Sequence, residues 1–139
     1  MHIFIKNKKL FLNHDKIKCA IGKRGIGTKK KEGDQITPKG KFKIKGIMYR
    51  KDRIPSFKSK IKKLTIKRNM GWCDDPRSKY YNKLIKFPFK YSAEQLYRKD
   101  NIYDIILILN YNINPIIKGK GSAIFIHVAK KNYNNTLGC

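Results

Sequence analysis

The last thirteen residues of the chain, HVAKKNYNNTLGC, contain two side chains suited to nucleophilic chemistry, His127 and Cys139. A cysteine thiol becomes a strong nucleophile when a nearby base removes its proton, and histidine is such a base near neutral pH. Gly138 lets the backbone approach closely, so its N–H and that of Cys139 can form an oxyanion hole. The same two side chains are also compatible with a buried strand histidine and an inert thiol.

The residues around this pair predict a set of strands. The apolar runs 122–128, which carries His127 near its end, and 102–111 predict buried strands. Alternating or short apolar segments predict further strands at residues 2–6, 9–12, 16–21, 42–46 and 63–67. The intervening glycine-rich, lysine-rich and asparagine-rich segments predict loops, and residues 71–82 predict an ordered polar loop.

One short helix is expected in SAEQLYRKD. Ser92 is a suitable N-cap, and Gln95 three residues later completes a capping box, which predicts about two helical turns. Residues 37–40 predict a turn, because Pro38 fixes φ and Gly40 permits a left-handed backbone. No repeat or linker divides the chain. The sequence therefore predicts a single mainly-β domain, sandwich or barrel-like, over residues 1–139.

Composition limits the class of protein. The 139 residues are 40% hydrophobic, as expected for one globular domain, and the longest apolar run, residues 105–109, is too short to span a membrane. Near the N-terminus, Asn7, Lys8 and Lys9 interrupt the apolar residues, so no secretory signal is visible.

The formal net charge of +25 raises the question of an anionic partner. An anionic polymer would be attracted without sequence preference, whereas lysines this dispersed, with few interleaved aromatic residues, do not predict specific nucleic-acid recognition. A compositional bias towards lysine, isoleucine and asparagine is an equally simple explanation. A basic binding module for wall polymer or nucleic acid, with an inactive site, is the alternative to an enzyme.

The three cysteines are Cys19, Cys73 and Cys139. Their spacing lacks any CxxC pair, so we expect neither a zinc site nor any other metal or cofactor. Cys19 lies in an alternating segment and is interpreted as a core thiol. A Cys19–Cys73 disulfide is the alternative in an oxidising compartment.

Five separate segments resemble one enzyme family. HVAKKNYNNTLGC resembles the His…(Ser/Thr)-x-Gly-Cys signature of the L,D-transpeptidase catalytic domain, the YkuD-like family, and EGDQITPKGKF resembles its Thr-Pro-x-Gly segment. GWCDDPRSKYYN, SAEQLYRKDNIYD and GKGSAIFIHVA are similar to blocks of its short, single-domain bacterial members. The segments follow the family's order over nearly the whole chain.

The resemblance implies a mainly-β sandwich that holds Cys139 at the mouth of a cleft, and acyl transfer on peptidoglycan stem peptides. Cys139 would attack the carbonyl of the third stem residue, a diamino acid, and the terminal D-alanine would leave. The side-chain amine of a second stem, a protein or water would then resolve the thioester, while His127 carries the proton. The resemblance also implies the periplasm or cell envelope, and we expect a monomer.

The sequence departs from the family pattern at two places. Leu137 stands where many members have His, and it cannot supply a polar side chain to orient the base. Members also continue beyond the cysteine, so we expect a truncated gene product that lacks the segment after the nucleophile.

Five further residues are candidate substrate contacts, each with a structural alternative. Asp74 and Asp75 suit the ammonium group of a diamino acid, but they also suit an Asx-type turn. Trp72 suits a cleft wall or the core, and Arg77 suits a substrate carboxylate or a solvated loop. Thr136 belongs to the Thr-x-Gly-Cys ending.

Overall fold

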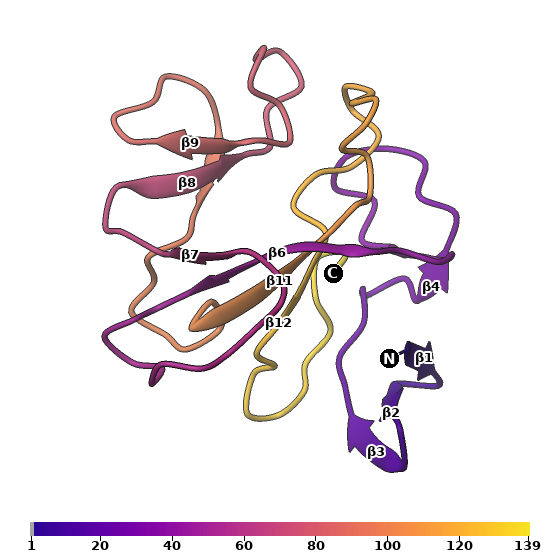
Figure 1. Cartoon of the computed structure of the whole chain (residues 1–139). Coiled ribbons are helices and arrows are strands. Elements are labelled where there is room, and N and C mark those ends of the chain that lie inside the picture. The colour runs from indigo at the N-terminus through magenta and orange to yellow at the C-terminus, as the bar shows by residue number, and fades with distance from the viewer. Residues whose placement is uncertain (1) are drawn as a thin grey trace.

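The computed structural model describes residues 2–139 and is mainly β, with no helix among those residues. Twelve strands form four sheets (Figure 1). They are β1 Ile3–Lys6, β2 Lys9–Leu12, β3 Asp15–Lys18, β4 Ile26–Gly27, β5 Thr37–Pro38, β6 Ile44–Tyr49, β7 Lys63–Thr65, β8 Met70–Cys73, β9 Leu84–Lys86, β10 Ala93–Gln95, β11 Ile105–Leu109 and β12 Phe125–His127. In this part of the chain no helix is long and apolar enough to cross a membrane.

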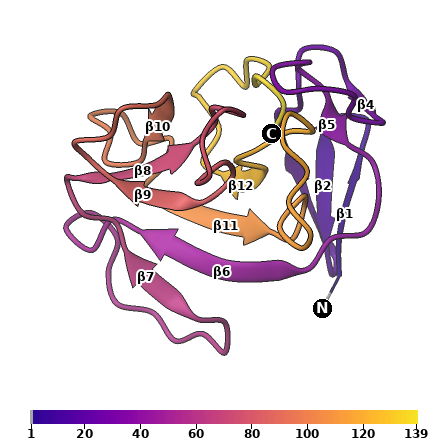
Figure 2. The same cartoon turned by 90° about the horizontal axis from the view of Figure 1, so that it is seen from above.

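Two sheets enclose the core. The larger has the order β12-β11-β6-β7, with β11 antiparallel to both neighbours, and the smaller has the order β10-β8-β9. The core residues come from both sheets and their connections: Met48, Ile66, Met70, Trp72, Leu96, Tyr103, Ile106, Ala123 and Phe125. Figure 2 shows the strands of the two sheets as successive layers. The fold is thus the mainly-β sandwich that the sequence predicts.

Two smaller sheets complete the fold. Strands β1, β2 and β3 form an antiparallel meander, and β4 pairs in parallel with β5. The β4–β5 pair is only two residues long on each side, yet it places residues 26–27 beside residues 37–38. The intervening loop is therefore closed at its base, and this loop proves to lie against Cys139.

A buried asparagine ties the smaller sheet to the connection that precedes β12. Asn82 Oδ1 accepts hydrogen bonds from the Trp72 indole N–H (2.8 Å) and the Ala123 N–H (3.0 Å), and its Nδ2 donates to the Asn112 carbonyl (2.8 Å). The Trp72 and Ala123 N–H groups are buried, so both would be left without an acceptor if Asn82 were absent. Asn82 also has a positive φ of 55°, which asparagine tolerates better than most residues.

The helix expected in SAEQLYRKD is wrong. Residues Ala93–Gln95 form strand β10, in which Ala93 pairs with Cys73 and Gln95 with Gly71. Leu96 is fully buried, and its N–H donates to the Met70 carbonyl. Pairing with β8 satisfies the backbone over a buried apolar surface, which outweighs a local capping box of two side chains.

Two other expectations also need correction. The segment 71–82 is not a polar loop throughout, because its first residues belong to the fully buried strand β8. No Cys19–Cys73 disulfide forms, since all three cysteines are free thiols. Cys73 is completely buried in β8, whereas Cys19 is half-buried after β3.

Replacing Asn82 by alanine should lower the free energy of unfolding by about 2–4 kcal/mol, because buried N–H donors lose their acceptor and alanine tolerates positive φ poorly. Urea unfolding followed by tryptophan fluorescence measures this loss. Asn135→Ala, at an exposed position, is the matched control and should stay within about 0.5 kcal/mol of the parent. Equal stability of the two variants would contradict the role given to Asn82.

Candidate active site

The Cys139 thiol lies against the backbone that leads into β12. Its Sγ donates a hydrogen bond to the Ala123 carbonyl (3.2 Å) and receives one from the Phe125 N–H. Burial raises the pKa of Cys139 to about 11, although the Phe125 N–H opposes that rise. In the resting structure the group is therefore a protonated thiol and not a thiolate.

His127 lies on the same strand, two residues beyond Phe125. Successive side chains of a strand alternate between faces, so His127 and Phe125 share one face, separated by roughly 7 Å along the strand. The Tyr103 ring packs edge-on against both rings, with centroid separations of 5.4 Å to His127 and 6.3 Å to Phe125. Burial raises the pKa of the Tyr103 hydroxyl and the charge of Cys139 adds to that rise, so Tyr103 belongs to the surroundings of both the imidazole and the thiol.

The backbone fixes the tautomer of His127. Its Nδ1 lies 2.9 Å from the Val128 carbonyl oxygen, which can only accept a hydrogen bond, so Nδ1 carries the proton and Nε2 keeps its lone pair. Burial lowers the pKa of His127 below its ordinary value. The imidazole is neutral near pH 7, with Nε2 free to accept a proton.

Two threonines and a short bridge hold the main chain of Cys139. The hydroxyls of Thr37 and Thr136 each donate to the Cys139 main-chain oxygen at 2.6 Å. Thr37 also accepts the Gly22 N–H at 2.7 Å. The Thr136 N–H donates to the Ile21 carbonyl, and the Thr136 carbonyl accepts from Lys23 N–H, which makes a parallel bridge between Gly22 and Thr136.

Gly138 has a φ of +137°, which a residue with a side chain rarely adopts. An added Cβ would lie 3.0 Å from Lys29 Nζ and 3.3 Å from the Ile36 carbonyl oxygen, so glycine is needed for space as well. Its N–H lies 3.3 Å from Thr136 Oγ1, a long hydrogen bond. The oxyanion role of this N–H and that of Cys139 stays a prediction.

A buried ion pair lies directly behind this glycine. Lys29 Nζ donates to Asp34 Oδ1 (2.7 Å) and to the Ile36 carbonyl (3.1 Å), and both charged side chains are only 3% exposed. Burial alone would raise the pKa of Asp34. Bonds from Lys29 and from the N–H groups of Lys30, Ile36 and Lys31 instead hold it well below its usual range. Asp34 of the Glu-Gly-Asp triplet thus shapes this loop.

Acidic side chains also act on the thiol. Burial raises the pKa of Glu94 on β10, while the Tyr103 hydroxyl opposes the rise, and the charges of Asp74 and Glu32 act on the same carboxyl. Glu94 and Glu32 also act on Cys139 and favour its protonated form. One oxygen of Asp74, Oδ1, is buried without a hydrogen-bond partner among residues 2–139.

The structure separates the five candidate substrate contacts. Trp72 is a core residue whose ring packs on Phe125. Asp75 accepts the Arg77 N–H and pairs with its guanidinium at 2.6 Å, which is the Asx-type turn of the structural alternative. This turn belongs to the β8–β9 connection, away from the C-terminal end of the chain (Figure 1). Thr136 lies within the site and bonds the Cys139 main chain, and Asp74 is connected to the site through its charge effect on the Glu94 carboxyl.

The comparison with protein families decides the assignment. The family model of the L,D-transpeptidase catalytic domain, YkuD, matches residues 1–139. The chain belongs to this family. No curated protein and no solved structure gives a significant match. L,D-transpeptidases act on peptidoglycan in the cell wall, which makes acyl transfer on a wall component the general activity of this domain.

Several residues of this L,D-transpeptidase site escaped the sequence analysis. Glu94 lies in the segment expected to be a helix, Tyr103 lies in the run expected to be a buried strand, and Lys29 lies in a lysine-rich loop where neighbouring lysines are exposed. Lys29, Lys30 and Lys31 stand five, four and three positions before Asp34 in TKKKEGD, and no local pattern indicates which of the three pairs with it.

The pH dependence of thiol alkylation should reveal the burial of Cys139. With a pKa of about 11 against an ordinary 9.0, the native thiolate fraction at pH 8 is lower by about a hundredfold. Iodoacetamide labelling of the peptide containing Cys139 should therefore keep rising beyond about pH 10 in native protein and level off near about pH 10 in urea. Native labelling that levels off below pH 9 would contradict this environment.

Proposed function

We propose that this protein is a cysteine-dependent L,D-transpeptidase that acts on peptidoglycan stem peptides as a single catalytic domain. The observation that supports the proposal most is that Cys139, at the end of the family's signature, docks beside the strand that carries His127. Its place of action is then the periplasm or cell envelope, and it works as a monomer without a cofactor.

The first half-reaction uses a neutral pair. Cys139 Sγ attacks the carbonyl carbon of the third stem residue, a diamino acid, while His127 Nε2 accepts the thiol proton. The oxyanion receives hydrogen bonds from the N–H groups of Gly138 and Cys139. Collapse breaks the amide bond, and the proton on Nε2 passes to the nitrogen of the departing D-alanine. The product is a thioester on Cys139.

The second half-reaction returns the enzyme to its starting state. The side-chain amine of a second stem attacks the thioester carbonyl, and His127 Nε2 takes a proton from the attacking nitrogen. Collapse releases the thiolate, which recovers that proton, and a 3–3 cross-link results. Glu94, whose charge acts on Cys139, and Asp74, whose charge acts on Glu94, supply carboxylates for the ammonium form of a diamino acid. Water in place of the amine gives carboxypeptidase activity.

A carbapenem, a strained acyl donor that this family accepts, should add covalently to Cys139 in intact-protein mass spectrometry. His127→Gln should slow acylation by about two to four orders of magnitude, because a general base is lost. His14→Gln, at an exposed position outside the site, is the matched control and should match the parent. An adduct that persists in Cys139→Ser, or a His127→Gln rate within a few-fold of the parent, would contradict the proposal.

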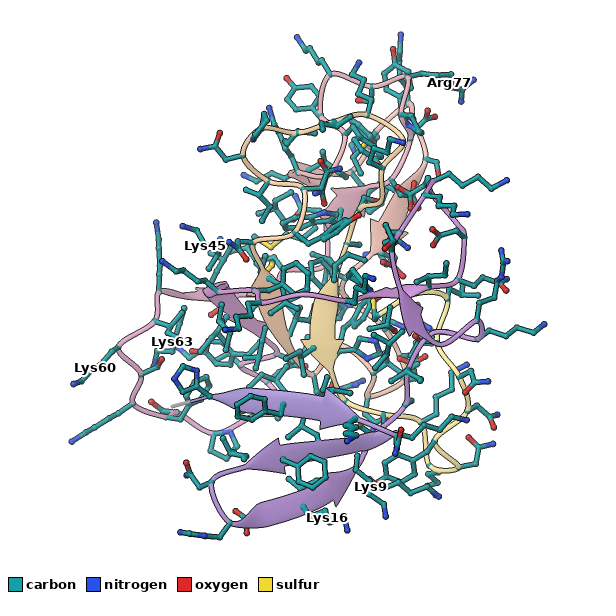
Figure 3. The ribbon with its side chains drawn as sticks, turned by 90° about the vertical axis from the view of Figure 1, so that its right-hand side faces the viewer. Lys9, Lys16, Lys45, Lys60, Lys63 and Arg77 are labelled. Carbon is teal, nitrogen blue, oxygen red and sulfur yellow. The ribbon has the colours of Figure 1, made fainter. Side chains whose placement is uncertain are left out.

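A second candidate function, contact with an anionic polymer, is favoured by one face of the β1–β3 sheet. The pairing register places Phe4 beside Phe11 and Phe11 beside Lys16, with Lys6, Lys9 and Lys18 in the next row of the same face. Phe4 is 64% exposed. Lys9 and Lys16 project from this sheet in Figure 3. Lysines suit the anionic groups of a polymer, and phenyl rings suit its sugar rings.

Binding to isolated cell-wall sacculi should weaken steeply between about 50 and 200 mM salt, because several charges are neutralised together. Replacing Lys9 and Lys16 by Gln should reduce co-sedimentation more than the same change at Lys60 and Lys62, an equal charge loss elsewhere on the surface. Equal losses in the two variants would show that only net charge matters. A preference for one DNA sequence at physiological salt would instead revive specific nucleic-acid recognition.

A further inference from the structure

Two glycines make room for one lysine side chain next to the thiol. An added Cβ at Gly121 would lie 2.5 Å from Lys29 Cε, and one at Gly138 would lie 3.0 Å from Lys29 Nζ. The stem of Lys29 therefore passes over Gly121, and its ammonium group ends at Gly138, the residue before Cys139. Both glycines have positive φ, so their backbones also need the freedom of glycine.

Two hydrogen bonds orient the ammonium group of Lys29 and leave its third N–H donor without a partner among residues 2–139. An ammonium group has three N–H donors, and Asp34 Oδ1 and the Ile36 carbonyl take two of them. Asp34 is held in turn by the N–H groups of Lys30 and Ile36, at 2.7 and 3.1 Å. The positive end of this buried pair thus lies at Gly138, and the negative end is turned to the loop backbone.

Charged groups on strand β10 and on the loop at residues 29–34 act on Cys139. Glu94 on β10 and Glu32 on the loop favour the protonated thiol, and Lys29 favours the thiolate. His127 on β12 is neutral near pH 7, and burial raises the pKa of Tyr103, so its hydroxyl is neutral as well. Among these three charged groups, Lys29 is the one that favours negative charge on sulfur.

We propose that Lys29 is a positioning residue that fixes the backbone at Gly138 and stabilises negative charge at Cys139 during acyl transfer. A buried cation beside the attacking sulfur lowers the cost of charge separation as the proton leaves for His127. The geometry that carries this inference is the pair of glycines cleared for a buried, oriented ammonium group. The catalytic meaning of the inference rests on the proposed function, but its effect on the thiol does not.

The test compares Cys139 labelling in matched variants of the full chain. Lys29→Gln keeps an N–H donor for Asp34 and removes the charge, so the pKa of Cys139 should rise and labelling by iodoacetamide at pH 9 should fall by about tenfold. Asp34→Asn removes the counter-charge and keeps an acceptor for Lys29, so labelling should become faster. Lys30→Gln, an equal charge change at an exposed neighbour, should leave the rate within about twofold of the parent.

Opposite signs in the Lys29 and Asp34 variants support the proposal, because a merely structural pair would change labelling in one direction when either partner is lost. Faster labelling in both variants, or parental rates in Lys29→Gln, would overturn it. Circular dichroism and thermal melting verify that each variant folds. If Lys29→Gln does not fold, the Asp34→Asn variant decides: faster labelling supports the proposal, and slower or unchanged labelling overturns it. If no carbapenem adduct forms but the Lys29 and Asp34 variants change the labelling rate in opposite directions, the proposed function is refuted and the effect of Lys29 on the thiol stands.

Discussion

The site depends on one long-range contact, the docking of residues 136–139 on the loops between residues 21 and 37. Thr37 donates to the main-chain oxygen of a residue 102 positions away, and the Gly22–Thr136 bridge adds backbone hydrogen bonds beside it. Without this contact neither the thiol nor Gly138 would have a defined position relative to β12. Closing so long a loop costs conformational entropy. The buried Lys29–Asp34 pair and the β4–β5 strand pair offset that cost, because they make the docking surface rigid before the C-terminal segment binds to it.

The electrostatics around the thiol differ from those of the molecule as a whole. The chain carries a net charge of +25, yet Glu94 and Glu32 act on Cys139 and burial favours its protonated form. His127 is neutral for a related reason, since burial disfavours the imidazolium. Both groups are therefore neutral near pH 7 in the resting structure. Under the proposed function, the thiol proton leaves as the acyl donor is attacked, when charge develops beside Lys29 and the backbone N–H groups.

The sequence predicts those parts of the fold and site that local patterns determine. Alternation and apolar runs correctly predict strands at β1, β2, β11 and β12, whereas the pairing of His127 with Cys139 in the chemistry stays a prediction. SAEQLYRKD was misassigned because its capping box is a local signal, whereas its strand state depends on the open edge of β8, which is distant in sequence. Lys29 could not be distinguished from Lys30 and Lys31 for the same reason, since only the folded loop decides which lysine is buried.

Native-state hydrogen exchange at two backbone amides tests the central claim that the C-terminal segment is docked and holds the thiol. The Thr136 N–H is bonded to the Ile21 carbonyl and the Lys23 N–H to the Thr136 carbonyl, so each reports directly on this contact. We expect both amides to exchange far more slowly than in an unfolded chain. We also expect Thr37→Val to accelerate the exchange of both without affecting the amide of Ile106 in β11. Exchange of the Thr136 and Lys23 amides at the rate of an unfolded chain in the parent protein would contradict the docking of the C-terminal segment.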